Sequence, residues 1–228
     1  ICDDEESREL VYAVDQILSR ADAKRNLEVY ANADTPEDAQ RARKFGAQGI
    51  GLCRTEHMFL GERRKLIETV ILAESEEDQQ EALRALIPLQ EGDFAGIFSA
   101  MDGLPVIVRL IDPPLHEFLP DNTALSVELA VKKALGEEIT AEETKLLKAV
   151  KANHEQNPML GLRGVRLGLK LPGLVKLQIH AIANACAALQ KAGKNPRPEI
   201  MVPLIASERE MQIVRDWALK IIKETSER

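Results

Sequence analysis

The chain has 228 residues, 45% of them hydrophobic and 29% charged, an ordinary globular composition with enough length to bury a core. A formal net charge of −7 excludes a general electrostatic attraction to nucleic acid or to anionic membranes. The low aromatic content of 4% argues against a base-stacking surface, and no apolar run reaches the roughly 18 residues of a membrane span. By length, we expect one large domain or two small ones.

Cysteine usage and the N-terminal residues bear on the compartment. Cys2, Cys53 and Cys186 are odd in number and far apart, so neither a disulfide framework nor a zinc-binding spacing is present. We therefore expect a reducing, cytoplasmic environment. The chain opens with an acidic stretch over 1–6 and no initiator Met, which is unlike a signal or transit peptide and predicts a segment of a longer polypeptide.

Apolar spacing predicts an alternation of helices and strands along the chain. The first helix is expected over about 7–23, within a leading helix or linker over 1–25. Thr140 and Glu143 form a capping-box pattern at the start of a later helix. Strands are expected over 27–33, 48–53, 105–111 and 198–205, and further helices over 35–45, 61–73, 76–100 with a break near Pro88 and Gly92, 124–135, 141–152, 174–192 and from Ser207 onward.

Strands separated by helices in this way predict a parallel sheet. Such a sheet is either doubly wound or part of a (β/α)8 barrel. No glycine-rich dinucleotide-binding or phosphate-binding fingerprint follows the first expected strand, where a doubly wound fold would carry one. The candidate functional residues instead follow the second and third strands, and the carboxyl ends of the strands form the catalytic face of a barrel.

Two apolar strands each deliver an arginine to one edge of the expected sheet. Arg54 follows the 48–53 strand, and Arg109 lies near the end of the 105–111 strand. A guanidinium is permanently charged and matches the planar geometry of a carboxylate or phosphate, so we predict one anionic ligand between the two. The alternative is internal pairing, Arg54 with Glu56 and Arg109 with Asp112, without any ligand.

The remaining candidate residues add less evidence for this site. Arg163, followed by Arg166, supplies a third cationic point ahead of a helix. His57 and His116 are candidates for proton transfer, although packing or hydrogen bonding is the commoner role of such histidines. Cys53 lies inside a strand and is expected to pack. Composition and spacing therefore predict an anion site on one edge of a parallel sheet, without a complete catalytic set.

Four motifs extend the argument beyond spacing. Residues 49–59 read GIGLCRTEHMF, 31–36 read ANADTP, 109–120 read RLIDPPLHEFLP, and 157–164 read NPMLGLRG. In this order they closely resemble the motifs of the pyruvate phosphate dikinase family, across nearly the whole chain. Phosphoenolpyruvate synthase and enzyme I of the sugar phosphotransferase system share only the Gly-Leu-x-Arg core, and they remain the alternatives.

The resemblance implies a fold and an activity. It implies that residues 1–228 are the N-terminal half of the barrel that binds phosphoenolpyruvate (PEP) and pyruvate: an α/β fold, the first half of a TIM (β/α)8 barrel with helical insertions. The parent phosphotransferase would interconvert ATP, phosphate and pyruvate with AMP, pyrophosphate and PEP, through a phosphohistidine on a separate domain of the same chain. Arg54, Arg109 and Arg163 match arginines that bind the phosphoryl and carboxylate groups.

Several features of the family have no counterpart in this chain, which bears on its expected activity. The Glu and Asp ligands of Mg²⁺ and the acid/base cysteine of the family have no counterpart, so the resemblance places the metal site beyond Arg228 and no catalytic residue within this chain. The nucleotide-binding domain and the phosphohistidine motif are missing too, so we expect the isolated chain to be inactive. The alternative to an enzyme segment is a stand-alone anion-binding module. Because a half barrel has two open edges, we expect a homo-oligomer or edges covered by helices.

Overall fold

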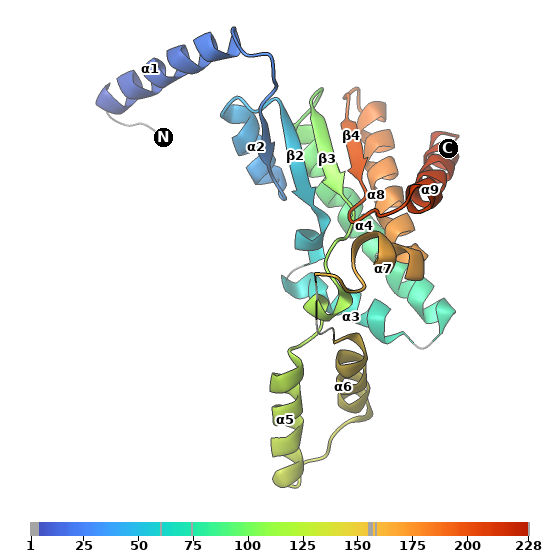
Figure 1. The fold of residues 1–228 in the computed structure, drawn as a ribbon. Coiled ribbons are helices and arrows are strands. Elements are labelled where there is room, and N and C mark those ends of the chain that lie inside the picture. The colour runs from blue at the N-terminus through green and yellow to red at the C-terminus, as the bar shows by residue number, and fades with distance from the viewer. Residues whose placement is uncertain (1–4, 60, 74, 155–156, 158, 228) are drawn as a thin grey trace.

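The structure is a computed structural model that describes residues 5–227 except 60, 74, 155–156 and 158. Cys2 and part of the 157–164 motif therefore lie outside the described residues. The described chain forms a parallel four-stranded sheet with helices packed against it (Figure 1), so the prediction of an α/β fold with a parallel sheet is confirmed.

The sheet runs in chain order. Its strands are β1 (Tyr30–Asn32), β2 (Gly49–Arg54), β3 (Pro105–Arg109) and β4 (Arg197–Met201), and each is parallel to the next. A doubly wound sheet reverses its strand order at a switch point, whereas the order β1-β2-β3-β4 continues in one direction. All the described strand ends that carry candidate residues therefore meet at one edge of the sheet.

The helices before, between and after the strands are of unequal length. They are α1 (Glu5–Asp22), α2 (Pro36–Lys44), α3 (Arg64–Leu72), α4 (Glu76–Ala100), α5 (Asn122–Ala134), α6 (Ala141–Asn153), α7 (Gly164–Lys170), α8 (Pro172–Lys191) and α9 (Glu208–Ser226), with short 3-10 helices η1 (Thr55–Phe59), η2 (Gly61–Arg63) and η3 (Leu115–Phe118). Among the described helices, none is both long and apolar enough to cross a membrane.

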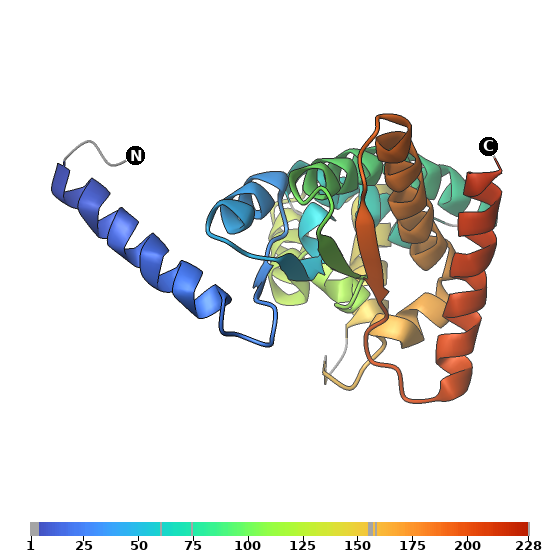
Figure 2. The ribbon, with the colours of Figure 1, turned by 90° about the horizontal axis from the view of Figure 1, so that it is seen from above.

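The two faces of the sheet differ in how they are covered. Side chains alternate between the faces of a strand. Cys53 and its register partner Val108 are fully buried beneath α4 and α8. On the opposite face, Ile107 is partly exposed and its partner Glu199 is exposed. Figure 2 shows α2, α4 and α8 gathered on one side of the sheet.

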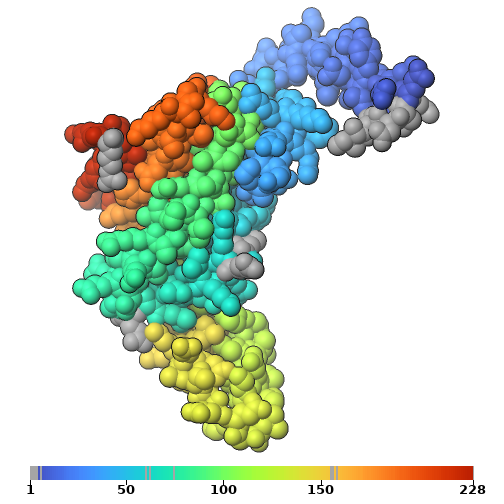
Figure 3. All heavy atoms as spheres, turned by 180° about the vertical axis from the view of Figure 1, so that it is seen from behind, coloured from blue at the N-terminus to red at the C-terminus, as the bar shows by residue number. Residues whose placement is uncertain are grey.

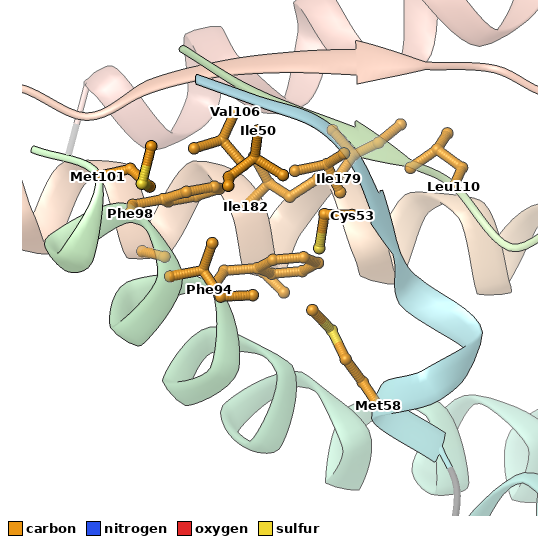
Figure 4. Packing of buried hydrophobic residues seen from close by; sticks show 14 of the residues in the cluster. Ile50, Cys53, Met58, Phe94, Phe98, Met101, Val106, Leu110, Ile179 and Ile182 are labelled. Carbon is orange, nitrogen blue, oxygen red and sulfur yellow. The ribbon is translucent and has the colours of Figure 1, made fainter. Parts of the chain in front are cut away.

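The main core lies between the sheet and this helical layer (Figure 4). Phe94 and Phe98 of α4 stack with ring centroids 5.8 Å apart beneath Ile50 of β2. Ile179 of α8 joins the same cluster. Burying each such side chain contributes on the order of 2 kcal/mol, so this layer fixes the positions of the strand ends.

Two segments extend from the body (Figures 1 and 3). The α5–α6 hairpin follows β3 and η3 and has a small core of its own, which includes Leu125, Leu129 and Val150. Its second helix begins with the predicted capping box of Thr140 and Glu143, which is confirmed. Helix α1 leads away from the sheet at the other end, with its apolar residues exposed.

Helix α4 differs from its prediction. It continues from Glu76 to Ala100 through Pro88, so the predicted break near Pro88 and Gly92 is wrong. A proline inside a helix removes one backbone hydrogen bond and crowds the preceding turn. Leu86 and Phe94 are buried on either side of this point, and their packing holds the two halves of the helix in line.

The remaining differences are at element ends and in one unexpected helix. Strand β1 is shorter than the expected 27–33, and helix α7 was not predicted. Helix α7 has only seven residues, too few for a clear apolar period, and tertiary contacts stabilise it through buried Val165 and Leu167. Pro172, expected to belong to a break, stands at the first turn of α8, where its fixed φ is compatible with a helix.

Candidate functional site

The carboxyl ends of β2 and β3 place two arginines side by side. Arg54 and Arg109 are the last residues of these strands and are register partners. By alternation they point to the same face as Ile107 and Glu199, the face opposite α4 and α8. Thr55 is fully buried and donates a hydrogen bond from Oγ1 to the carbonyl oxygen of Arg109 (2.9 Å), which ties the two strand ends together.

Arg54 is held by a carboxylate from the β1–α2 connection. Asp34 accepts hydrogen bonds from Arg54 Nε (3.0 Å to Oδ2) and Nη2 (2.6 Å to Oδ2), and from the backbone N–H of Arg54 (2.7 Å to Oδ1). The alternative internal pairing, in which Arg54 would bind Glu56, is therefore wrong for this arginine. His57 Nδ1 lies 3.0 Å from the same Asp34 Oδ2, so one carboxylate holds both side chains.

Arg109 and Arg163 form a second, connected group. Arg109 Nη2 pairs with Glu56, and Arg109 Nη1 lies 3.3 Å from Asp112 Oδ2, so the internal pairing with Asp112, given above as the alternative, is present. Arg163 Nη2 binds the same Asp112 oxygen at 2.7 Å. The structure therefore brings Arg109 and Arg163 together on one carboxylate, and the strand register brings Arg54 beside them.

The start of α7 delivers Arg163 to this edge. Arg163 is the N-cap of α7, and Gly164 N donates to the carbonyl oxygen of Asp112 (2.9 Å). Gly164 has φ +56, and a Cβ there would lie 2.9 Å from the carbonyl oxygen of Pro203. Glycine is therefore required at this position, and it lets the chain run close enough to the β3 and β4 ends to insert Arg163.

The charges of the group balance. Three guanidiniums, Arg54, Arg109 and Arg163, face three carboxylates. The Arg54 side chain is 39% exposed, against 21% for Arg109 and 22% for Arg163, so Arg54 is the most accessible to a ligand. Glu56 Oε2, Arg109 Nε and Asp112 Oδ1 are buried without a hydrogen-bond partner among the described residues. Such an arrangement holds cationic groups in fixed positions for an anion.

The electrostatic state of Asp34 follows from its neighbours. Burial alone would raise the pKa of this carboxyl, but the hydrogen bonds and charge of Arg54, with the charge of His57, outweigh burial and hold the pKa below its usual value. Asp34 is therefore ionised at neutral pH. It is the acceptor that an Arg and a His share.

The other candidates take structural positions. Arg166 donates to the carbonyl oxygens of Leu160 and Gly161, so it braces a loop. Burial raises the pKa of Cys53 to about 12 and that of Cys186 to about 11, which agrees with packing and not with a thiolate nucleophile. The His116 ring lies 6.4 Å from that of His154, and the described ion pairs of the three arginines do not involve it.

The carboxylates at this edge do not fit a Mg²⁺ site. Asp34, Glu56 and Asp112 each bind a guanidinium, and Mg²⁺ prefers oxygen ligands that converge on one point. In the part of the chain that the structure describes, no three His, Cys, Asp or Glu residues come close enough to hold a metal ion. We therefore derive no metal-dependent step from these residues.

Sequence reasoning missed Asp34, which was noted only within a motif. Its signal was available: Asp34 follows the first strand at the same sheet edge as Arg54. In a parallel sheet, residues after neighbouring strands meet in space. A carboxylate after β1 is thus a natural partner for an arginine after β2.

Comparison with known proteins identifies the family of the chain. Residues 8–228 match the family model described as PEP-utilising enzyme, PEP-binding domain. The chain therefore belongs to this family of phosphoenolpyruvate-binding domains.

The chain is also similar to individual proteins that are named pyruvate, phosphate dikinase. The chain is 48% identical over 216 residues to pyruvate, phosphate dikinase 1, chloroplastic, of Arabidopsis thaliana and 50% identical over 210 residues to pyruvate, phosphate dikinase 2 of Zea mays. It is 46% identical over 199 residues to pyruvate, phosphate dikinase of Giardia intestinalis. These matches cover 92%, 90% and 87% of this chain but 22%, 23% and 22% of the relatives, so the chain spans about a fifth of their length.

Proposed function

We propose that this chain is the N-terminal half of the PEP- and pyruvate-binding (β/α)8 barrel of a pyruvate phosphate dikinase. The strand order, which follows the chain without reversal, supports a barrel. So does the cover of helices on one face only, because a barrel sheet has helices outside and side chains inside. The dikinase relatives support the choice among PEP-utilising enzymes over the alternatives of PEP synthase or an enzyme I-type phosphocarrier.

In this proposal Arg54, Arg109 and Arg163 bind the phosphoryl and carboxylate groups of PEP. The observation that carries the proposal is the register pairing of Arg54 with Arg109 at the carboxyl edge, on the face away from α4 and α8. The arginines would neutralise charge on the transferring phosphoryl group, an electrostatic role that requires donors held in place before the ligand arrives. Their carboxylate partners provide that orientation.

The complete reaction belongs to the proposed parent enzyme. It would interconvert ATP, phosphate and pyruvate with AMP, pyrophosphate and PEP, with a phosphohistidine domain of the same parent chain as partner. The Mg²⁺ ligands would lie outside the 228 residues, in keeping with the pairing of all three site carboxylates to arginines. A cytoplasmic location stays a prediction, since the names of several plant relatives include the word chloroplastic.

Ligand binding tests the proposal. We expect calorimetry to show that the chain binds PEP without Mg²⁺, with a dissociation constant on the order of 1 mM. R54A should weaken binding at least about tenfold, because a charge-assisted pair is lost. R41A is the matched control, since Arg41 is 69% exposed on α2. Equal binding by the wild type and R54A would contradict the proposed site.

A turnover assay tests whether the isolated chain is inactive. We expect no PEP-dependent formation of ATP from AMP and pyrophosphate by the isolated chain, because the metal ligands and the acid/base cysteine have no counterpart in it. Clear activity would refute this part of the proposal. PEP affinity without turnover fits an enzyme segment and also the second candidate, a stand-alone anion-binding module, which the balanced and self-contained arginine network favours.

Self-association is the remaining proposal. Strands β1 and β4 are the outer strands of the described sheet, and exposed strand edges attract further strands. We propose that the chain self-associates or that helices cover these edges. Light scattering that shows only a monomer at high concentration would exclude self-association.

A further inference from the structure

Asp34 contacts two partly exposed side chains, Arg54 at the end of β2 and His57 in the following η1. Its carboxylate is only 10% exposed, and it binds Arg54 through both oxygens and His57 through Oδ2. It also accepts from the backbone N–H of Arg54, so it fixes the strand end as well as the side chain. These contacts link the β1–α2 connection to β2 across 20 residues of sequence.

The contacts restrict the Arg54 guanidinium to one orientation. Nε and Nη2, which form one side of the planar fork, both bind Asp34, while Nη1 takes no part in these bonds. A long arginine side chain otherwise loses rotamer entropy when a ligand immobilises it. Asp34 imposes that loss during folding, so a ligand would meet an arginine that is already oriented.

The contact with His57 fixes a proton. Asp34 is an ionised acceptor, so it favours a proton on Nδ1 of His57, and the Nδ1–H tautomer is the one that this contact selects. The His57 side chain is 40% exposed, so Nε2 is on a side chain that solvent and ligands can reach. The same carboxylate thus sets the direction of one cation and the tautomer of the neighbouring imidazole.

We infer that Asp34 is a positioning residue of the anion site, which acts through Arg54 and His57 and does not touch the ligand. The inference rests on the proposed function for its effect on PEP, but its structural part can be measured without any ligand. This positioning role predicts a change in anion affinity opposite in sign to the one that charge alone predicts. Removing a carboxylate near an anion site would strengthen anion binding by electrostatics alone, whereas loss of positioning weakens it.

The first experiment measures positioning in the ligand-free chain by ¹⁵N NMR of arginine and histidine side chains. In the wild type we expect a slowly exchanging Arg54 Nε–H signal and the Nδ1–H tautomer of His57. D34N should broaden or shift that signal and mix the tautomers, whereas D38N, which changes an exposed acid on α2, should leave both unchanged. An unchanged Arg54 signal and tautomer in D34N would overturn the inference. If D34N does not fold, D34E carries the same test.

The second experiment is a double-mutant cycle on PEP affinity, measured by calorimetry. We expect D34N to weaken binding about tenfold with Arg54 present and less than about twofold in the R54A background, because coupled residues are not additive. Equal losses in both backgrounds, or tighter binding by D34N, would overturn the inference. If the wild type does not bind PEP, the proposed function fails, and the NMR experiment alone decides the role of Asp34.

Discussion

Arg54 and Arg109 are the last residues of neighbouring parallel strands and are register partners. Asp34, which follows β1, holds Arg54, and Glu56, which follows β2, holds Arg109. Two like charges in adjacent positions of a sheet repel each other. Asp34 and Glu56 compensate that repulsion while leaving Arg54 partly exposed. The pair is therefore stable as a feature of the fold and open to an anion.

The bridge at Asp112 should be important for stability. D112N removes the charge that Arg109 and Arg163 share, in a carboxylate that is only 10% exposed. We expect the free energy of unfolding in urea to fall by about 2–3 kcal/mol, since breaking a largely buried pair leaves charges without partners. D216N, at an exposed position of α9, should change it by less than about 0.5 kcal/mol. Similar effects of both substitutions would contradict this role of Asp112.

Gly164 should tolerate no side chain. It has φ +56, and an added Cβ would meet the Pro203 carbonyl oxygen at 2.9 Å, so G164A should destabilise the fold by about 2–3 kcal/mol. G136A provides the control, because Gly136 has φ +75 with no atom within 4 Å of a Cβ, and should cost only about 1–2 kcal/mol. Thermal unfolding can rank the two, and an equal or smaller cost for G164A would rule out the close approach at α7.

The Asp34 network predicts a pH dependence. The folded-state pKa of Asp34 lies below its usual value of about 4, so the ionised carboxylate stabilises the fold together with Arg54 and His57. That contribution is complete above the unfolded pKa and is lost as the pH falls through the folded pKa. The difference in unfolding free energy between the wild type and D34N should shrink as the pH falls below about 4. A difference that grows below about pH 4 would contradict the ion pair.

Replacing Pro88 should stabilise the chain. The proline is exposed inside continuous helix α4, so P88A restores a backbone hydrogen bond without removing a core contact, and we expect a gain of about 1–3 kcal/mol in urea unfolding. P36A is the control, since Pro36 stands at the first helical positions of α2 and packs against Gly96. It should give no gain. A loss of stability in P88A would mean that the helix needs the proline.

Several features of the fold and the site could be predicted from local sequence patterns. The strands that deliver Arg54 and Arg109 were predictable, because an apolar run followed by an arginine is a local pattern. The capping residues of α6 and α9 were equally local. Local patterns also suggested, as the alternative, that Arg109 pairs with Asp112, three residues away, and this pairing is present.

The incorrect predictions concern features that depend on tertiary structure and not on local sequence. Arg54 pairs with Asp34 and Glu56 with Arg109 because the parallel register brings different strands together, which sequence neighbours do not reveal. Helix α4 passes through Pro88 because tertiary packing outweighs a local propensity. The charge-balanced network was therefore not predicted from spacing, and Asp34 was the member that the candidate residues lacked.

The most direct test of the central claim is a titration of the ¹⁵N-labelled chain with PEP, followed through arginine Nε–H signals. We predict that the signals of Arg54, Arg109 and Arg163 shift together with a single dissociation constant, while the signal of exposed Arg41 does not shift. Saturable binding of PEP that leaves the three signals unchanged, or that shifts arginines elsewhere on the chain, would contradict the assignment of the anion site to this edge of the sheet.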